Sequence, residues 1–222
     1  MKVLACATVI EELEHFLPEG VEYKTLEFGL HIHPERLRET LQAEIDRIDR
    51  FAQAETILLG YGLCGLGVVG LRSARNCLVI PRVDDCIAIF LGSQEEYLRQ
   101  TRQEPGTFYL TKGWIEAGSN PYTEYQRLAE CYGEERAMKI SKIALANYTR
   151  LALINTGNYQ IKRYRKFAGE TARLFGLRYE EIPGSTALVR KMGQGLWNEG
   201  EFLLLPPGET VRFEMFMMEG GV

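Results

Sequence analysis

TILLGYGLCGLGVVGL, residues 56–71, joins a short apolar run to a loop that carries five glycines around one cysteine. An apolar run of this length that ends in glycine is typical of a buried strand in a parallel sheet. A phosphate-binding loop would need Lys followed by Ser or Thr, and the spacing of the glycines does not give GxGxxG. The stretch therefore predicts a strand followed by a site loop that is built around Cys64 rather than around a phosphate.

Strand and helix patterns alternate on both sides of this stretch, which favours a three-layer α/β fold. We expect two Rossmann-like parallel-sheet lobes, residues 1–104 and 148–222, joined by a helical and irregular connector over residues 105–147. The lobes would face each other across a cleft. Strands are expected at residues 2–9, 21–28, 56–60, 77–81, 107–111, 150–156, 177–182 and 202–205.

Length and composition narrow the class of protein. A chain of 222 residues can bury a core without disulfides, and its 5 cysteines are odd in number and scattered. The formal net charge is -4, with no basic tract of the kind that nucleic-acid binding needs, and no apolar run approaches the ~20 residues of a membrane span. We expect a cytoplasmic protein that binds neither nucleic acid nor membrane, and its oligomeric state is left open.

Three cysteines follow strands that should be neighbours. Cys6 ends the first strand, Cys64 lies in the glycine loop, and Cys86 follows the strand at residues 77–81. Since loops at the carboxyl ends of parallel strands meet in the ligand crevice, these thiols should gather there. Thiolates are ligands for Zn²⁺ or an iron–sulfur cluster, and three protein ligands leave a position for a substrate. Packing of small buried cysteines and a catalytic or redox thiol remain alternatives.

Other residues could complete this site. His31 could be the fourth ligand of a zinc site, although a lone histidine is more often structural. Gly62 and Gly65 would let the backbone approach a bulky ligand and donate N–H groups to sulfur.

The segment PRVDDC, residues 81–86, places charged groups beside Cys86. Arg82, Asp84 and Asp85 could hold a substrate carboxylate or relay a proton. The alternative is that an Arg–Asp pair only shapes the loop.

Three further residues are candidates for binding in the expected cleft. Lys112 could contact an anion, and Trp114 could form a wall of the cleft or an aromatic plug between the lobes. Asn155 lies at the carboxyl end of the strand at residues 150–156 and would belong to a polar rim.

Five segments, taken in order, resemble the domain of unknown function family 1638: LACATVIEELE, GLHIHPERL, LLGYGLCGLGVVGL, IPRVDDCIAIFLGS and GTFYLTKGWIE. The resemblance implies an origin in anaerobic bacteria or methanogenic archaea and genes near those of corrinoid-dependent methyltransferases. It carries over no established activity, so the function must be argued from the site.

These observations lead to one expectation with two alternatives. We expect a metal-binding protein of one-carbon or corrinoid methyl metabolism, in which a zinc or iron–sulfur centre carries out methyl transfer or redox chemistry on a small-molecule substrate. A corrinoid would be reached only through a partner protein. The alternatives are a metal-free small-molecule-binding enzyme and a non-catalytic partner of a corrinoid protein, so whether the chain is an enzyme stays open.

Overall fold

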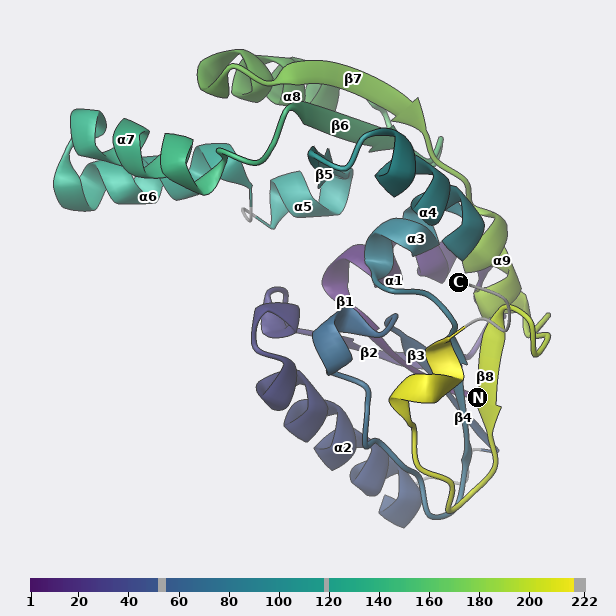
Figure 1. The fold of residues 1–222 in the computed structure, drawn as a ribbon. Helices are drawn as coiled ribbons and strands as arrows, with labels where there is room; N and C mark the ends of the chain where they lie inside the picture. The colour runs from purple at the N-terminus through teal and green to yellow at the C-terminus, as the bar shows by residue number, and fades with distance from the viewer. Residues whose placement is uncertain (52–54, 118–119, 218–222) are drawn as a thin grey trace. The chain divides into compact units, whose positions relative to one another are not determined.

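The computed structural model describes residues 1–51, 55–117 and 120–217 (Figure 1). The chain forms an α/β fold with two compact units. Unit 1 combines Met1–Gln94 with Thr186–Val222, and unit 2 is Glu95–Ser185. Each unit has its own sheet.

Unit 1 is built on a five-stranded sheet of order β2-β1-β3-β4-β8. The first four strands are parallel neighbours, and β8 pairs antiparallel with β4. The central strands consist of buried aliphatic side chains, as expected for a sheet that is covered on both faces. The strands are β1 (Lys2–Cys6), β2 (Glu22–Leu26), β3 (Thr56–Gly60), β4 (Cys77–Pro81) and β8 (Phe202–Leu205).

Helices cover both faces of this sheet. The connection from β1 to β2 and the connection from β2 to β3 run in opposite directions across the sheet, so right-handed crossovers put α1 and α2 on opposite faces. Helix α9 packs against α1 and α3. The helices and 3₁₀ turns of unit 1 are α1 (Ala7–Leu13), η1 (Glu14–Phe16), η2 (Leu30–Ile32), α2 (Pro34–Phe51), η3 (Cys64–Leu66), α3 (Cys86–Leu91), α9 (Ala187–Gln194) and η4 (Phe213–Phe216).

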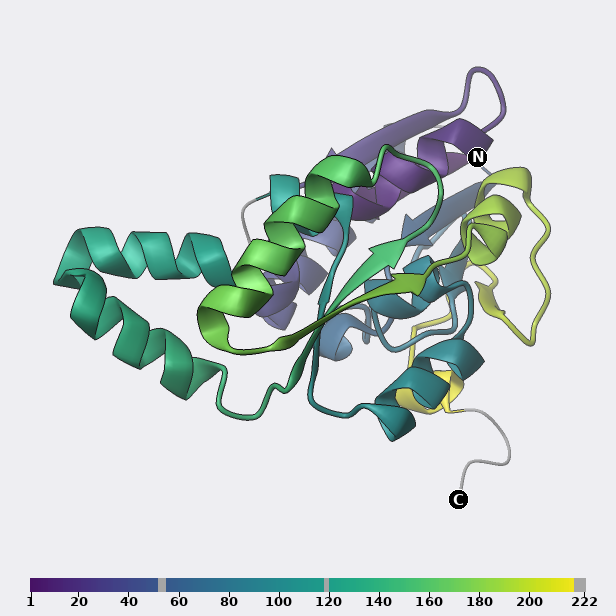
Figure 2. The same ribbon diagram turned by 90° about the horizontal axis from the view of Figure 1, so that it is seen from above.

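Unit 2 is built on a parallel three-stranded sheet of order β5-β6-β7. Helix α8 lies across β6 and β7, and its apolar side packs on a core that includes Leu151 and Leu153 (Figure 2). Helices α6 and α7 pack together as a hairpin. The elements are α4 (Gln94–Gln103), β5 (Thr107–Leu110), α5 (Lys112–Glu116), α6 (Pro121–Tyr132), α7 (Glu134–Ala144), β6 (Arg150–Asn155), α8 (Lys162–Phe175) and β7 (Arg178–Pro183).

The units divide the chain differently from the expected boundaries at residues 104 and 148. Strand β5 and helices α5 to α7, which the sequence assigns to a connector, belong to unit 2, and α9 and β8 return to unit 1. The apolar strand at 202–205 pairs antiparallel with the free edge of β4. In this pairing Leu78 lies opposite Leu205 and Pro81 lies opposite Phe202. The strand expected at residues 2–9 ends earlier, at Cys6, because helix α1 begins at Ala7.

Candidate functional site

The three cysteines that the sequence singles out all lie at the carboxyl edge of the unit 1 sheet. Cys6 is the last residue of β1, Cys64 is the first residue of η3 beyond β3, and Cys86 is the first residue of α3 beyond β4. Strands β1, β3 and β4 are consecutive and parallel, so their carboxyl ends are adjacent. The expectation that topology delivers these residues to one edge is confirmed.

Hydrogen bonds hold the loop that carries Cys64 on the loop after β4. The amides of Leu63 and Cys64 donate to the carbonyl oxygens of Val83 and Asp84, both at 2.8 Å. Gly62 permits this approach, because a Cβ there would lie 2.6 Å from the oxygen of Val83. The glycines therefore bring two loops together, which is a structural reason for them beside the predicted contact with a ligand.

Backbone strain is concentrated at the same loop. Cys64 has φ 46° and Leu66 has φ 76°, the described non-glycine residues with positive φ, and Gly65 between them has φ 63°. Side chains other than glycine are disfavoured in this region by about 1–2 kcal/mol each. Such strain tends to occur at functional sites, where the surrounding structure maintains it.

Tyr61 directly follows β3 at the same edge of the sheet. Its side chain is buried, with 3% of its surface exposed, and its hydroxyl has no hydrogen-bond partner among the described residues. Burial raises the pKa of Tyr61, and the charges of Cys6, Cys64 and Cys86 raise it further. All three sulfur atoms are therefore near enough to this hydroxyl to act on it electrostatically.

The thiols differ in their surroundings. Burial raises the pKa of the Cys64 thiol to about 12, with further contributions from Asp85 and Cys6, and the backbone N–H of Gly62 opposes the shift by hydrogen bonding to the sulfur. The sulfur of Cys6 lies 3.5 Å from the hydroxyl oxygen of Thr8. Cys64 is thus a protonated thiol at neutral pH.

The described residues hold no ready-made metal site, since no three of their His, Cys, Asp and Glu side chains are grouped so that they could hold an ion. All five cysteines are free thiols. The backbone of His31 lies in η2, and its side chain lies outside what the structure describes. The three candidate thiols share one edge of the sheet, but in the described residues they do not form a finished set of ligands.

The charged segment before Cys86 is partly structural. The carboxylate of Asp85 caps α3 by accepting a 2.8 Å hydrogen bond from the amide of Ile87. The amide of Asp84 donates to the side-chain oxygen of Gln94 at 3.0 Å. The Nε atom of Arg82 is buried and has no hydrogen-bond partner in the described part of the chain.

Lys112, Trp114 and Asn155, the remaining predicted binding residues, belong to unit 2. Lys112 forms an ion pair with Glu116 at 3.4 Å, and Trp114 packs against the core of unit 2. The side chain of Asn155 donates to Glu181 at 3.0 Å and accepts from the amide of Gly157 at 3.1 Å. Each of these side chains has a structural role inside its own unit.

Comparison with protein families places the chain. The profile of a family described as "Protein of unknown function (DUF1638)" matches residues 25–192. The chain belongs to the DUF1638 family. The matched range includes Cys64 and Cys86 and begins after Cys6. The search of curated proteins and the search of solved structures each returned no significant match.

One further observation concerns the membrane. None of the helices in the described part of this DUF1638 protein is both long enough and apolar enough to span a bilayer.

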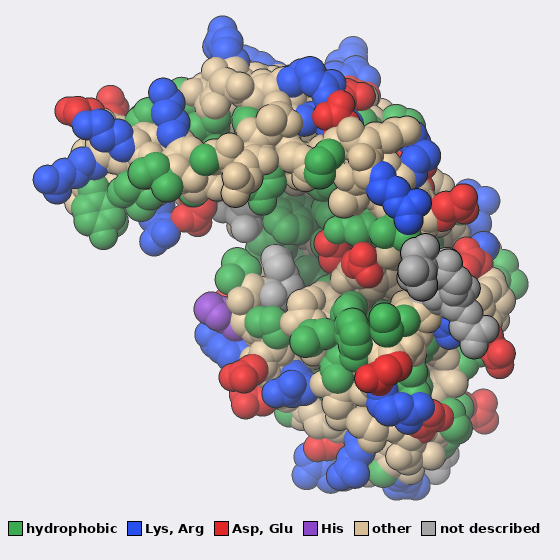
Figure 3. Space-filling view, viewed as in Figure 1, with side chains coloured by type: hydrophobic (Ala, Val, Ile, Leu, Met, Phe, Trp, Pro, Cys, Tyr) green, Lys and Arg blue, Asp and Glu red, His purple; other side chains and the backbone are tan. Residues whose placement is uncertain are grey.

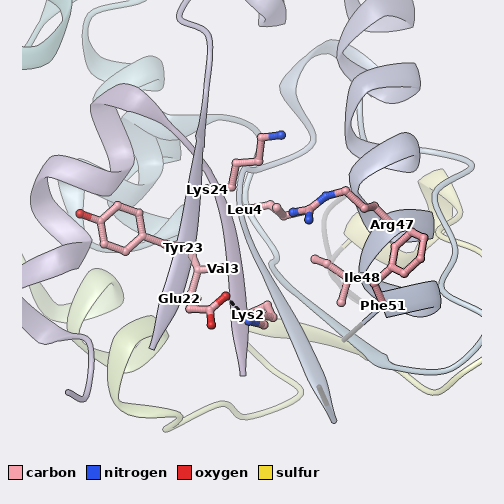
Figure 4. Close-up of a pocket in the computed structure, with 9 residues that line it drawn as sticks. All are labelled: Lys2, Val3, Leu4, Glu22, Tyr23, Lys24, Arg47, Ile48 and Phe51. Carbon is pink, nitrogen blue, oxygen red and sulfur yellow. Dashed lines mark hydrogen bonds and ion pairs between the residues drawn. The ribbon is translucent and has the colours of Figure 1, made fainter. Parts of the chain in front are cut away.

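A cavity of unit 1 lies beside the amino-terminal halves of β1 and β2, against α2 (Figure 4). It measures about 240 Å³, and its cations have carboxylate partners. Lys2 pairs with Glu22, while Lys24 and Arg47 pair with Glu44 at 2.6 and 3.0 Å. Each of the three cations already has a carboxylate partner, and Lys24 and Arg47 share one, so the cavity is a weaker candidate site than the thiol edge.

Tyr61 is the site residue that sequence reasoning missed in this DUF1638 protein. A signal was available, because Tyr61 stands between two glycines directly after a buried strand. A tyrosine in that position must place a hydroxyl near the carboxyl edge of the sheet.

Proposed function

We propose that unit 1 binds a soft metal centre, Zn²⁺ or an iron–sulfur cluster, through Cys6, Cys64 and Cys86. The observation that carries the proposal is that Cys6, Cys64 and Cys86 follow three adjacent parallel strands and so lie at the carboxyl edge of one sheet. The donor set fits the group, because thiolates are the preferred ligands of both centres and three of them leave one position for another ligand. His31 is the candidate for the fourth ligand.

The protonation state of Cys64 favours a metal over a metal-free catalytic thiol. With a pKa of about 12, this thiol is protonated at neutral pH and is a poor nucleophile. A bound metal supplies the charge that stabilises the thiolate, so metal binding would release the proton of each thiol that becomes a ligand. Affinity for the metal should therefore increase with pH.

Two neighbours of the sulfur atoms would tune such a centre. The backbone N–H of Gly62 favours the thiolate form of Cys64, since it lowers the pKa of that thiol. The buried hydroxyl of Tyr61 would find its missing acceptor in a thiolate sulfur. Hydrogen bonds to the sulfur ligands are a main means by which a protein adjusts a metal centre.

The chemistry that we propose is methyl transfer or redox chemistry on a small molecule in one-carbon or corrinoid methyl metabolism. The support is the resemblance to this family, which implies a corrinoid protein as a partner, together with the open position that three thiolates leave on a metal. A reducing cytoplasmic compartment would keep the thiols free, as they are in the structure.

The test is the metal content of the full chain after anaerobic purification. We expect stoichiometric zinc, or iron with sulfide and a visible charge-transfer spectrum. Cys6→Ser, Cys64→Ser and Cys86→Ser should each lower metal occupancy. Cys131→Ser is the matched control, because Cys131 is an exposed thiol on α6. Wild-type protein without stoichiometric metal, and with occupancy that none of the three serine variants changes, would refute the proposal.

A metal-free small-molecule site is the second candidate, and Arg82 is the observation in its favour. A buried guanidinium nitrogen without a partner is costly, and an anionic ligand would satisfy it. If Arg82→Met weakens binding of a carboxylate ligand while metal content stays at zero, this second function replaces the first.

A further inference from the structure

A pocket lies between the two helices of the α6–α7 hairpin, entirely within unit 2. It measures about 440 Å³, inside the range typical of small-molecule sites. On the face shown in Figure 3, hydrophobic side chains gather over these two helices. We call this cavity the α6–α7 pocket. Its lining residues used below are Phe108, Asn120, Leu128, Ser141, Ala144 and Tyr148.

Most of the wall is apolar and rigid. The rings of Phe108 and Tyr148 pack edge to face, with centroids 5.3 Å apart and planes inclined by 63°. Leu128 from α6 and Ala144 from α7 supply aliphatic surface. An aromatic or aliphatic ligand body would bury its surface against these side chains at little cost in conformational entropy.

Asn120 contributes a hydrogen-bond donor that the protein leaves unused. Its side chain is 2% exposed, and its oxygen accepts from the amides of Tyr122 and Thr123, both at 3.1 Å, as the cap of α6. This cap fixes the orientation of the carboxamide, because a flipped amide would point its NH₂ group at two donors. The Nδ2 atom has no partner among the described residues.

Ser141 contributes a second unused polar group from the facing helix. Its side chain is 5% exposed, and its hydroxyl has no hydrogen-bond partner in the described structure. A serine in a helix usually satisfies its hydroxyl on the carbonyl one turn earlier, and this one does not. Leaving two buried polar groups unsatisfied costs about 1–3 kcal/mol each, unless something else binds them.

We propose that the α6–α7 pocket binds a small apolar molecule that carries an oxygen acceptor, such as a ketone or an amide. Its carbonyl oxygen accepts from Asn120 and Ser141, and its apolar body packs on Phe108, Leu128 and Tyr148. The assignment to a small molecule rests on the volume of the pocket and on two of its lining residues whose buried polar atoms have no partner in the described structure. It does not depend on the thiol site, because every lining residue belongs to unit 2.

The test uses prodan, a naphthyl ketone whose fluorescence responds to hydrogen bonding at its carbonyl, titrated into the full chain. Asn120→Asp is the decisive variant, since Asp keeps the cap of α6 but removes the donor. We expect Asn120→Asp to weaken prodan binding about ten-fold and to shift the bound emission to the blue. Ala144→Phe should fill the pocket and abolish binding.

Two further variants keep the proposal falsifiable. Ser141→Ala should weaken binding while leaving the thermal stability unchanged or higher, since the hydroxyl it removes has no partner in the protein. Ile143→Ser is the matched control for adsorption to the surface, because Ile143 is 76% exposed and does not line the pocket. Equal affinity in the wild type, Asn120→Asp and Ala144→Phe, or a loss of binding only in Ile143→Ser, would overturn the proposal.

Discussion

The backbone amide of Cys64 donates a 2.8 Å hydrogen bond to the carbonyl oxygen of Asp84. The bond joins the loop after β3 to the loop after β4, so the positions of Cys64 and Cys86 depend on each other. Whatever the three thiols bind, the geometry of the site is set by contact between two stretches of backbone. This contact is the most direct target for mutation.

Gly62→Ala should disrupt that contact. The new Cβ would lie 2.6 Å from the oxygen of Val83 and 2.9 Å from the nitrogen of Asp85, which are backbone atoms that cannot move independently. Overpacking of this kind costs about 1–3 kcal/mol. Denaturant unfolding should show this loss, together with faster alkylation of Cys64. In Gly169→Ala, where a Cβ meets nothing within 4 Å on α8, stability should be unchanged or higher, and an equal loss there would contradict the explanation.

Stability should fall at alkaline pH because of Cys64. The pKa of this thiol rises from 9.0 to about 12 on folding, so the unfolded chain releases the proton first. The contribution is complete below about pH 9 and is lost as pH rises towards 12. Between about pH 8 and about pH 10, the unfolding free energy of metal-free wild type should fall by about 1 kcal/mol more than that of Cys64→Ala. The exposed Cys131 provides the control, since Cys131→Ala should follow the wild type.

Asp49 should make the fold sensitive to acid. It is buried at the end of α2, where it accepts hydrogen bonds from the Ser73 hydroxyl at 2.6 Å, the Ala74 amide at 2.7 Å and the Asn76 side chain at 2.6 Å. Burial alone would raise its pKa, but these donors outweigh burial and lower it. The stabilisation is therefore present above about pH 4 and is lost as pH falls through the lowered pKa.

Removal of the Asp49 carboxylate tests this network. Asp49→Ala should lower the unfolding free energy at neutral pH by about 2–4 kcal/mol, because it leaves buried donors without an acceptor. The variant should also lose less stability than the wild type on acidification. Asp46→Ala on the same helix is the control, since Asp46 is exposed. An equal effect at both positions would argue against the buried network.

Arg150 should be the least replaceable charge of unit 2. Its buried guanidinium donates to Thr107 at 2.8 Å, Gln100 at 3.0 Å and Glu180 at 3.1 Å, which ties α4 to all three strands. Lysine cannot reproduce this fork, so Arg150→Lys should cost about 2–3 kcal/mol and increase hydrogen exchange in β6. Arg178, which also pairs with Glu180, is half exposed, and Arg178→Lys should have a much smaller effect. If the two variants are equally stable, the hydrogen bonds of the buried Arg150 guanidinium contribute nothing to the stability of unit 2.

Local sequence patterns predicted helices and strands well where an apolar run has clear polar or turn residues at both ends. The strands at 56–60, 77–81 and 202–205 were located to the residue, because each is a short apolar run bounded by polar or turn residues. Within the connector, the strand expected at 107–111 is β5, whereas α5 and the start of α6 were not predicted individually. Asn120 followed by Pro121 is a typical helix start, and giving it more weight would have predicted the start of α6.

Local periodicity in the amino-acid sequence was enough to predict the α/β class, and the geometry of parallel strands was enough to predict that Cys6, Cys64 and Cys86 lie at one sheet edge. The family was identified by the resemblance of its motifs. Only the tertiary structure decided that β8 completes the first sheet, since an apolar run of four residues carries no record of its partner. The missing hydrogen-bond partners of Tyr61, Asn120 and Ser141 are likewise visible only in the folded structure. Whether a buried polar group has a partner depends on neighbours that are distant in sequence.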